Sequence, residues 1–172
     1  GAEVQTAALA GTAPRGASQA DDRALGEELR DSLKDGDEHA FVVRHLQSVL
    51  EECCDDVEVA RQPRLLRTRT VQHLCTDLRA RQRAGASVSL LRLAERLHPT
   101  PAVGGAPVDA ALRWLADHEH AERGWFAGPL GFLRSDGDGE FVVALRSALV
   151  RANRATAWAG AVLATDARSY GE

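Results

Sequence analysis

The stretch from residue 97 to residue 105, LHPTPAVGG, constrains the fold more than any other part of the chain. Pro99 and Pro101 each fix φ and lack a backbone N–H, so neither a continuous helix nor a central strand can run through them. Gly104 and Gly105 then free the backbone from the restrictions that a Cβ atom imposes. A rigid bend followed by two glycines is more specific than a plain connection between two helices requires.

Helical patterns lie on both sides of this bend. Apolar residues recur at helical spacing in these segments. The clearest pattern covers residues 37–53, where Phe41, Leu46 and Leu50 lie on the apolar side. Pro107 is suited to the first position of a helix. The patterns predict helices over residues 21–34, 37–53, 89–97 and 107–120.

Strand patterns occupy the rest of the chain. Alternating residues predict a first strand that ends in a turn over residues 11–16, and an antiparallel meander that begins at Pro129. Within the meander, the DGDG sequence at residues 136–139 predicts a hairpin turn. The predicted strands cover residues 3–10, 65–78, 129–135, 140–151 and 156–164. We therefore expect one α+β unit.

Composition limits the classes of function. The chain has 172 residues, 44% of them hydrophobic, which suffices for one core. The net charge of −4, with acids and bases interspersed, argues against a nucleic-acid partner. No apolar run has the length of a membrane span, which argues against a membrane protein. The odd number of cysteines, without zinc spacing, predicts buried thiols in a reducing cytoplasm.

Two features could belong to a binding site. Asp35 and Glu38 are three residues apart near a helix start, so both carboxylates can point the same way; they either compensate the helix dipole or hold a hard divalent cation. Arg146 lies in a predicted strand, where alternation puts it on one face with Val142 and Ala144. There it is either an edge residue or a guanidinium that grips a planar carboxylate with two hydrogen bonds.

The order of the motifs resembles a known family. LAGTAPRG, SLKDGDEHAFVV, VQHLCTDL, LHPTPAVGGAP, RGWFAGPLGF and DGDGEFVVALRSALV are similar, in this order, to segments of the chorismate-utilising enzymes, and they span the whole chain. HPTPAVGG points to the isochorismate synthase branch, which serves siderophore and menaquinone synthesis. The resemblance implies the chorismate-binding fold, with helices packed on one side of an antiparallel sheet. It also implies magnesium as cofactor and chorismate as substrate.

The resemblance assigns roles to individual residues. Glu38 is similar to a magnesium ligand, Asp35 to a residue that supports such a ligand, and Glu172 to the first glutamate of the family's E-x-x-E motif. Arg146 resembles the arginine that holds a substrate carboxylate. The remaining substrate-binding positions implied by the resemblance are Gly11, Thr12, His73, Ala102 and Gly160. In this interpretation, the bend at residues 97–105 brings the backbone close to a flat anion.

The family's lysine base and glutamate acid precede the Gly-Thr turn and match no residue of this chain, so the catalytic residues stay unassigned. We expect residues 1–172 to be the C-terminal portion of a chorismate-binding domain, without its N-terminal half and extreme C-terminus, and inactive alone. A complementary N-terminal half would then be its partner. The alternatives are a non-catalytic module that binds chorismate or a partner, and a fragment of another chorismate enzyme such as anthranilate synthase.

Overall fold

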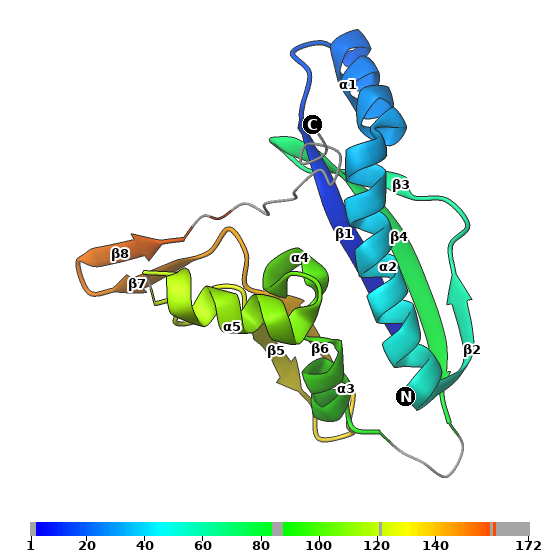
Figure 1. The fold of residues 1–172 in the computed structure, drawn as a ribbon, viewed down its shortest axis with the longest axis vertical. Coiled ribbons are helices and arrows are strands. Elements are labelled where there is room, and N and C mark those ends of the chain that lie inside the picture. The colour runs from blue at the N-terminus through cyan, green and yellow to red at the C-terminus, as the bar shows by residue number, and fades with distance from the viewer. Residues whose placement is uncertain (1–2, 84–87, 121, 159, 161–172) are drawn as a thin grey trace, which may run out of the picture.

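The computed structural model describes residues 3–83, 88–120, 122–158 and 160 (Figure 1). Its first part is an antiparallel sheet in which β4 is central and β1 forms an edge. β4 pairs with β1 on one side, and with β2 and β3 on the other. These strands are β1 (Glu3–Pro14), β2 (Cys54–Val59), β3 (Arg64–Arg67) and β4 (Val71–Gln82). The predicted strand over 65–78 is therefore two strands, because the chain turns back at residues 68–70.

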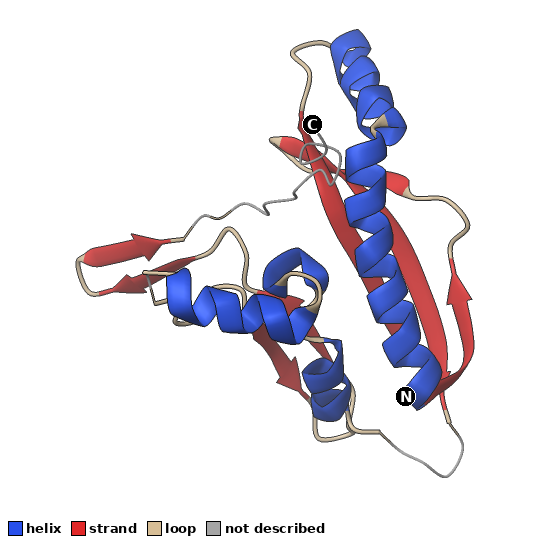
Figure 2. Cartoon of the chain, in the orientation of Figure 1, coloured by secondary structure: helices blue, strands red, loops and turns tan. Residues whose placement is uncertain are grey.

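Two helices, α1 (Gln19–Asp31) and α2 (Leu33–Cys53), pack on one face of this sheet, as Figure 2 shows. The expected α+β class and the one-sided packing of helices are confirmed. The break between the helices falls at Ser32, although the sequence placed it near Gly36. Ser32 caps α2 by accepting a hydrogen bond from the Asp35 backbone N–H, whereas Gly36 sits in open space and is tolerated within the helix.

The core lies between α2 and the sheet. Apolar side chains from alternate positions of β4 meet the buried side of α2. The central buried residues are Ala8, Val42, Leu46, Leu50, Cys53, Cys54, Leu78 and Ala80. Phe41 was expected on the apolar side of α2 but is exposed, with the Arg44 guanidinium 4.8 Å above its ring.

The second part of the molecule contains short elements. The helices are α3 (Leu90–Leu97), α4 (Pro101–Gly104) and α5 (Val108–His118), and the strands are β5 (Pro129–Leu133), β6 (Gly139–Val143), β7 (Ala148–Arg151) and β8 (Arg154–Ala157). α3 and α4 contact α2, and Leu93, Leu97 and Ala102 pack against the core. This part is thereby joined to the first one.

The predicted meander is instead two separate hairpins, β5–β6 and β7–β8. The turn at 136–139 is confirmed: β5 and β6 pair across it, and the Asp136 carboxylate accepts from the Asp138 backbone N–H. The predicted strand 140–151, however, is interrupted at residues 144–147. There the Ser147 hydroxyl donates to the Ala144 carbonyl, a local hydrogen bond that competes with a strand ladder.

The bend at residues 97–105 contains a helical turn that the two prolines were expected to prevent. Pro101 occupies the start of α4, where its missing N–H has no helical partner to lose. Gly105 then ends the turn at φ +81, a conformation that favours glycine. Pro107 is the N-cap residue of α5, so it lies one position before the helix and not at its first residue.

Large apolar side chains stay exposed on the second part. Those of β5, β6 and their surroundings are Trp125, Leu130, Phe132, Leu133, Val142, Val143, Leu145 and Val150. We call this set the apolar surface. So many large apolar side chains in contact with water are unusual for a folded monomer. Within the described ranges, no helix is long and apolar enough to span a membrane, and the cysteines are free and buried.

Candidate active site

The predicted site begins at a bulge in β1. The register between β1 and β4 shifts between Ala10 and Thr12, and Gly11 adopts φ +76. A Cβ atom on Gly11 would lie 3.2 Å from Asp35 Cβ and 3.4 Å from Leu74 Cδ1. Glycine is therefore required both by the backbone conformation and by the close approach of α2. The expected turn over residues 11–16 is thus a bulge within β1, which continues to Pro14. We call Gly11 and Thr12 at this bulge the Gly-Thr turn, and it lies against the first turn of α2.

Thr12 and His73 meet directly after the bulge. They are opposite each other in the ladder, and Thr12 Oγ1 lies 2.9 Å from His73 Nδ1. Thr12 is exposed and His73 is half-buried, so both present polar atoms near the end of the sheet where β1 finishes and β4 begins. The sequence predicted each residue separately as a substrate contact, and the structure brings the two together.

Burial lowers the pKa of His73, and the positive charge of Arg146 lowers it further, while a backbone interaction with Gly11 opposes both effects. The imidazole is thus held in its neutral form, which has one donor and one acceptor nitrogen. The effect of Arg146 also places its charge within electrostatic reach of His73.

Arg146 itself lies in the interruption between β6 and β7, with φ +48, and its side chain is exposed. The prediction that it shares a strand face with Val142 and Ala144 is wrong, because the turn held by Ser147 takes it off the strand. A left-handed conformation is uncommon for a residue other than glycine, and Asp56, Ala127 and Ala152 share it. The role of Arg146 as a carboxylate ligand stays a prediction.

Asp35 belongs to the first turn of α2, and Glu38 follows one turn later. The Ser32 hydroxyl donates to Asp35 Oδ2 at 2.5 Å, so Asp35 completes the cap while its other oxygen faces Gly11. Glu38 is half-buried. Spacing of three residues puts both carboxylates on one side of the helix. Asp35 therefore has a structural role at the cap, and Glu38 is the better candidate ligand.

Carboxylate oxygens are the donors that magnesium prefers, and a site with one or two protein carboxylates is usual because water and substrate complete the shell. Asp35 and Glu38 fit this donor chemistry. Within the part of the chain that the structure describes, no three histidine, cysteine or acidic side chains form a metal-binding group. Glu172 lies outside the described residues.

The other predicted contacts lie elsewhere. Ala102 is on α4 and packs against the core beside α2, and Gly160 approaches the ring of Phe126, which would be 3.4 Å from a Cβ atom there. No contact among the described residues joins either one to Thr12 or His73. The convergence of Glu38, Arg146, His73, Gly160 and the Ala102 backbone on one pocket stays a prediction; the charge of Arg146 acts on His73, and no contact among the described residues joins the others. Gly11, Thr12 and Asp35 lie close to one another or to His73.

His39 was not among the predicted residues, although it follows Glu38 directly. Its side chain is buried, and Nε2 lies 2.7 Å from the Thr76 hydroxyl, which ties α2 to β4. Burial lowers the pKa of this histidine, and a backbone interaction with Ala10 opposes that effect. The available signal was its place in the D-E-H motif, which puts it one residue away from a candidate ligand.

A hollow of about 240 Å³ opens beside the Gly-Thr turn. It is lined by Thr12, Ala13, Pro14, Leu25, Glu28, Leu29, Ser32 and Asp35. The end of β1 therefore has accessible space on the side of the two helices, next to the residues that the sequence singled out.

The fold and the sequence together assign the chain to a family of chorismate-binding enzymes. The sequence profile of the family described as "Chorismate binding enzyme" matches residues 1–172, and the chain belongs to this family. The chain is 46% identical over 164 residues to the salicylate biosynthesis isochorismate synthase of Pseudomonas aeruginosa, covering 95% of this chain and 34% of that protein.

Solved structures agree. The menaquinone-specific isochorismate synthase MenF from Escherichia coli superposes with a TM-score of 0.76 at 34% identity, over 85% of this chain and 33% of that one. Anthranilate synthase component I from Streptococcus pneumoniae has the same fold, with a TM-score of 0.74 at 24% identity, over 86% of this chain and 32% of that one. The family resemblance is confirmed, and the chain spans about a third of the length of these relatives.

Proposed function

We propose that this chain supplies the part of an isochorismate synthase that holds chorismate and magnesium. The observation that carries the proposal is the meeting of Thr12 and His73 beyond the Gly11 bulge, beside the first turn of α2. Relatives named as isochorismate synthases are 34–46% identical to the chain, against 24% for anthranilate synthase component I, which favours this branch. The product, isochorismate, would be a precursor for menaquinone or siderophore synthesis in the cytoplasm.

In this proposal, the reaction adds water to one ring carbon of chorismate while a hydroxyl leaves from another and the double bond shifts. Chorismate is a dicarboxylate, so its site must neutralise negative charge in a restricted volume. Arg146 would grip one carboxylate with two hydrogen bonds. Neutral His73 and the Thr12 hydroxyl would orient the ring by directional hydrogen bonds, and Ala102 and Gly160 would offer backbone N–H groups.

Magnesium, when bound, would neutralise the charge of a substrate carboxylate. Glu38 would hold it, Asp35 would fix the helix start behind that ligand, and Glu172 is proposed as a further ligand. The base and the acid of the reaction would come from the rest of the protein, as would the partner that covers the apolar surface. Trp125, Phe132 and Val142 would be buried by that contact.

Incubation with chorismate and magnesium, followed by chromatography of the products, tests the proposal. The intact protein that carries this chain should form isochorismate without ammonia, and the 172-residue chain alone should not. Anthranilate formed only with ammonia would assign the protein to the other branch. Chorismate binding without any product would favour the non-catalytic module.

A further inference from the structure

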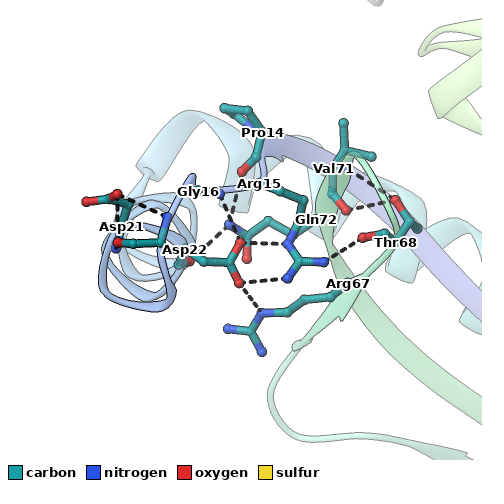
Figure 3. A network of polar contacts seen from close by, with 10 residues as sticks. Pro14, Arg15, Gly16, Asp21, Asp22, Arg67, Thr68, Val71 and Gln72 are labelled. Carbon is teal, nitrogen blue, oxygen red and sulfur yellow. Dashed lines mark hydrogen bonds and ion pairs between the residues drawn. The ribbon is translucent and has the colours of Figure 1, made fainter.

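Asp22 lies at the centre of a polar network next to the Gly-Thr turn (Figure 3). Its carboxylate accepts from Arg15 Nε at 2.6 Å and from the second Arg15 nitrogen at 3.0 Å, so the pair is bidentate. It also accepts from the Gly16 backbone N–H at 3.0 Å, and Arg67 Nε lies at 3.2 Å. The side chain of Asp22 is only 13% exposed. One carboxylate thus links three parts of the fold: α1, β3 and the segment that follows β1.

Gln72 extends the network to the strand that carries His73. It is fully buried, and its Nε2 donates to the Pro14 carbonyl and to the Asp22 carbonyl, both at 3.2 Å. Gly26 lets α1 come this close, because a Cβ atom there would lie 2.9 Å from the Gln72 amide oxygen. The backbone directly preceding His73 is therefore fixed to the end of β1 and to α1.

The end of β1 needs such a clamp. Among the described strands, β1 pairs with β4 alone, and the Gly11 bulge interrupts that ladder. Beyond the bulge the register continues for three residues, Thr12 to Pro14, and a proline has no N–H to donate. Past Pro14 the backbone pairing ends with the bond from the Arg15 N–H to the Thr70 carbonyl, at 3.3 Å. Few backbone contacts therefore hold Thr12 opposite His73.

The network is not required to start α1. Ser18 and Asp21 form a complete capping box: the Ser18 hydroxyl accepts from the Asp21 N–H, and the Asp21 carboxylate accepts from the Ser18 N–H. Asp22 follows directly but makes none of these bonds. Asp21 and Asp22, neighbours on α1, thus make different contacts. A substitution of Asp21 is therefore a control for a substitution of Asp22.

We propose that Asp22 is a positioning residue for the chorismate site: by gripping Arg15 and Gly16 it holds Thr12 in place opposite His73. The inference rests on the proposed function, because it needs Thr12 and His73 to contact the substrate. Asp22 does not touch the substrate itself. Its effect on catalysis passes through the geometry of the Gly-Thr turn.

The test compares Asp22→Asn with Asp21→Asn in the intact protein that carries this chain. Both variants lose one carboxylate at the start of α1, and both should lower the melting temperature. Only Asp22→Asn should raise KM for chorismate, by about tenfold, with kcat within about threefold, as expected when a charge-assisted contact that fixes a binding group is lost. Arg15→Lys, which keeps the charge but not the bidentate geometry, should raise KM by a smaller factor of about three.

Equal losses of melting temperature with KM unchanged in both aspartate variants would overturn the inference, since the clamp would then be structural only. If Asp22→Asn does not fold, an unchanged KM in Arg15→Lys has the same meaning. A wild-type protein that neither binds nor converts chorismate would overturn the proposed function instead. In that case, hydrogen exchange in Asp22→Asn should still be faster at residues 12–16, and unchanged exchange there would refute the clamp itself.

Discussion

Thr12 Oγ1 lies 2.9 Å from His73 Nδ1, in the first residue pair after the Gly11 bulge. A bulge locally increases twist and redirects the side chains that follow it. Thr12 is exposed in spite of this contact, so the pair contributes little to the core and remains accessible to a ligand. In the proposed function, this combination of a bulge, a hydroxyl and a neutral imidazole would supply the groups that orient chorismate.

Replacing Thr12 with valine should separate binding from stability. Thr12→Val removes the hydroxyl at nearly constant volume, and we expect kcat/KM for chorismate in the intact protein to fall about tenfold, the effect of about one lost hydrogen bond to a charged ligand. The melting temperature should change little, because the residue is exposed. Steady-state kinetics beside thermal unfolding measure both. Thr156→Val, at an exposed position of β8, is the control, and equal kinetics in the two variants would contradict the assignment.

The two acidic residues of α2 should differ in their effect on magnesium. Glu38→Gln removes a proposed ligand, whereas Asp35→Asn keeps a group that can accept from Ser32. We expect Asp35→Asn to weaken magnesium about tenfold, as for other residues that support a ligand, and Glu38→Gln to weaken it more. Magnesium dependence of the intact protein's activity measures this. Glu51→Gln, on the exposed end of α2, should behave like the wild type; a normal magnesium response in Glu38→Gln would refute its role as a ligand.

Stability should fall as the pH drops below about 6.5. Burial lowers the pKa of His39, His73 and His98 from the ordinary value of 6.5. In the window between each lowered pKa and 6.5, the unfolded chain binds a proton that the folded chain does not, so the free energy of unfolding decreases as the pH falls. Each such histidine can contribute up to about 1.4 kcal/mol per pH unit.

Denaturant unfolding of the chain at several pH values between 5 and 8 checks this dependence. His39→Gln should flatten the curve, whereas His120→Gln, at an exposed position after α5, should leave its shape unchanged. Identical curves for His39→Gln and the wild type would show that buried His39 does not cause the loss.

Local sequence patterns predicted helices and turns well where short-range features, such as apolar spacing or turn-forming residues, determine the structure. The buried side of α2 and the hairpin turn at 136–139 are examples, because apolar spacing and turn-forming residues act over short distances. The strand containing Arg146 was predicted wrongly. The apolar alternation from Phe141 to Val150 hides a turn that depends on the hydrogen bond from Ser147 to Ala144, which residue spacing cannot reveal.

The site was predictable only in its parts. The motifs singled out Gly11, Thr12, His73 and Asp35, which the structure brings together. Their contacts depend on the register of β1 against β4, and a bulge shifts that register by an amount that the sequence does not specify. Asp22 escaped notice for the same reason. Its partners Arg15 and Arg67 are distant from each other along the chain, and both reach Asp22 only because β3 and the end of β1 pair with β4 at the same level, on opposite sides of Gln72.

Replacement by alanine should destabilise the protein far more at Gly11 than at Gly36. Both glycines are close to Asp35, Gly11 in space and Gly36 along the chain. Gly11 has φ +76, and a Cβ atom there would press on Asp35 Cβ at 3.2 Å, so Gly11→Ala should lower the free energy of unfolding by at least about 1–2 kcal/mol. Gly36 is inside α2 with nothing within 4 Å of a Cβ atom, so Gly36→Ala should raise it by about 0.5–1 kcal/mol. Denaturant unfolding of the two variants gives both values. Equal tolerance at the two positions would mean that the bulge does not bring β1 against α2.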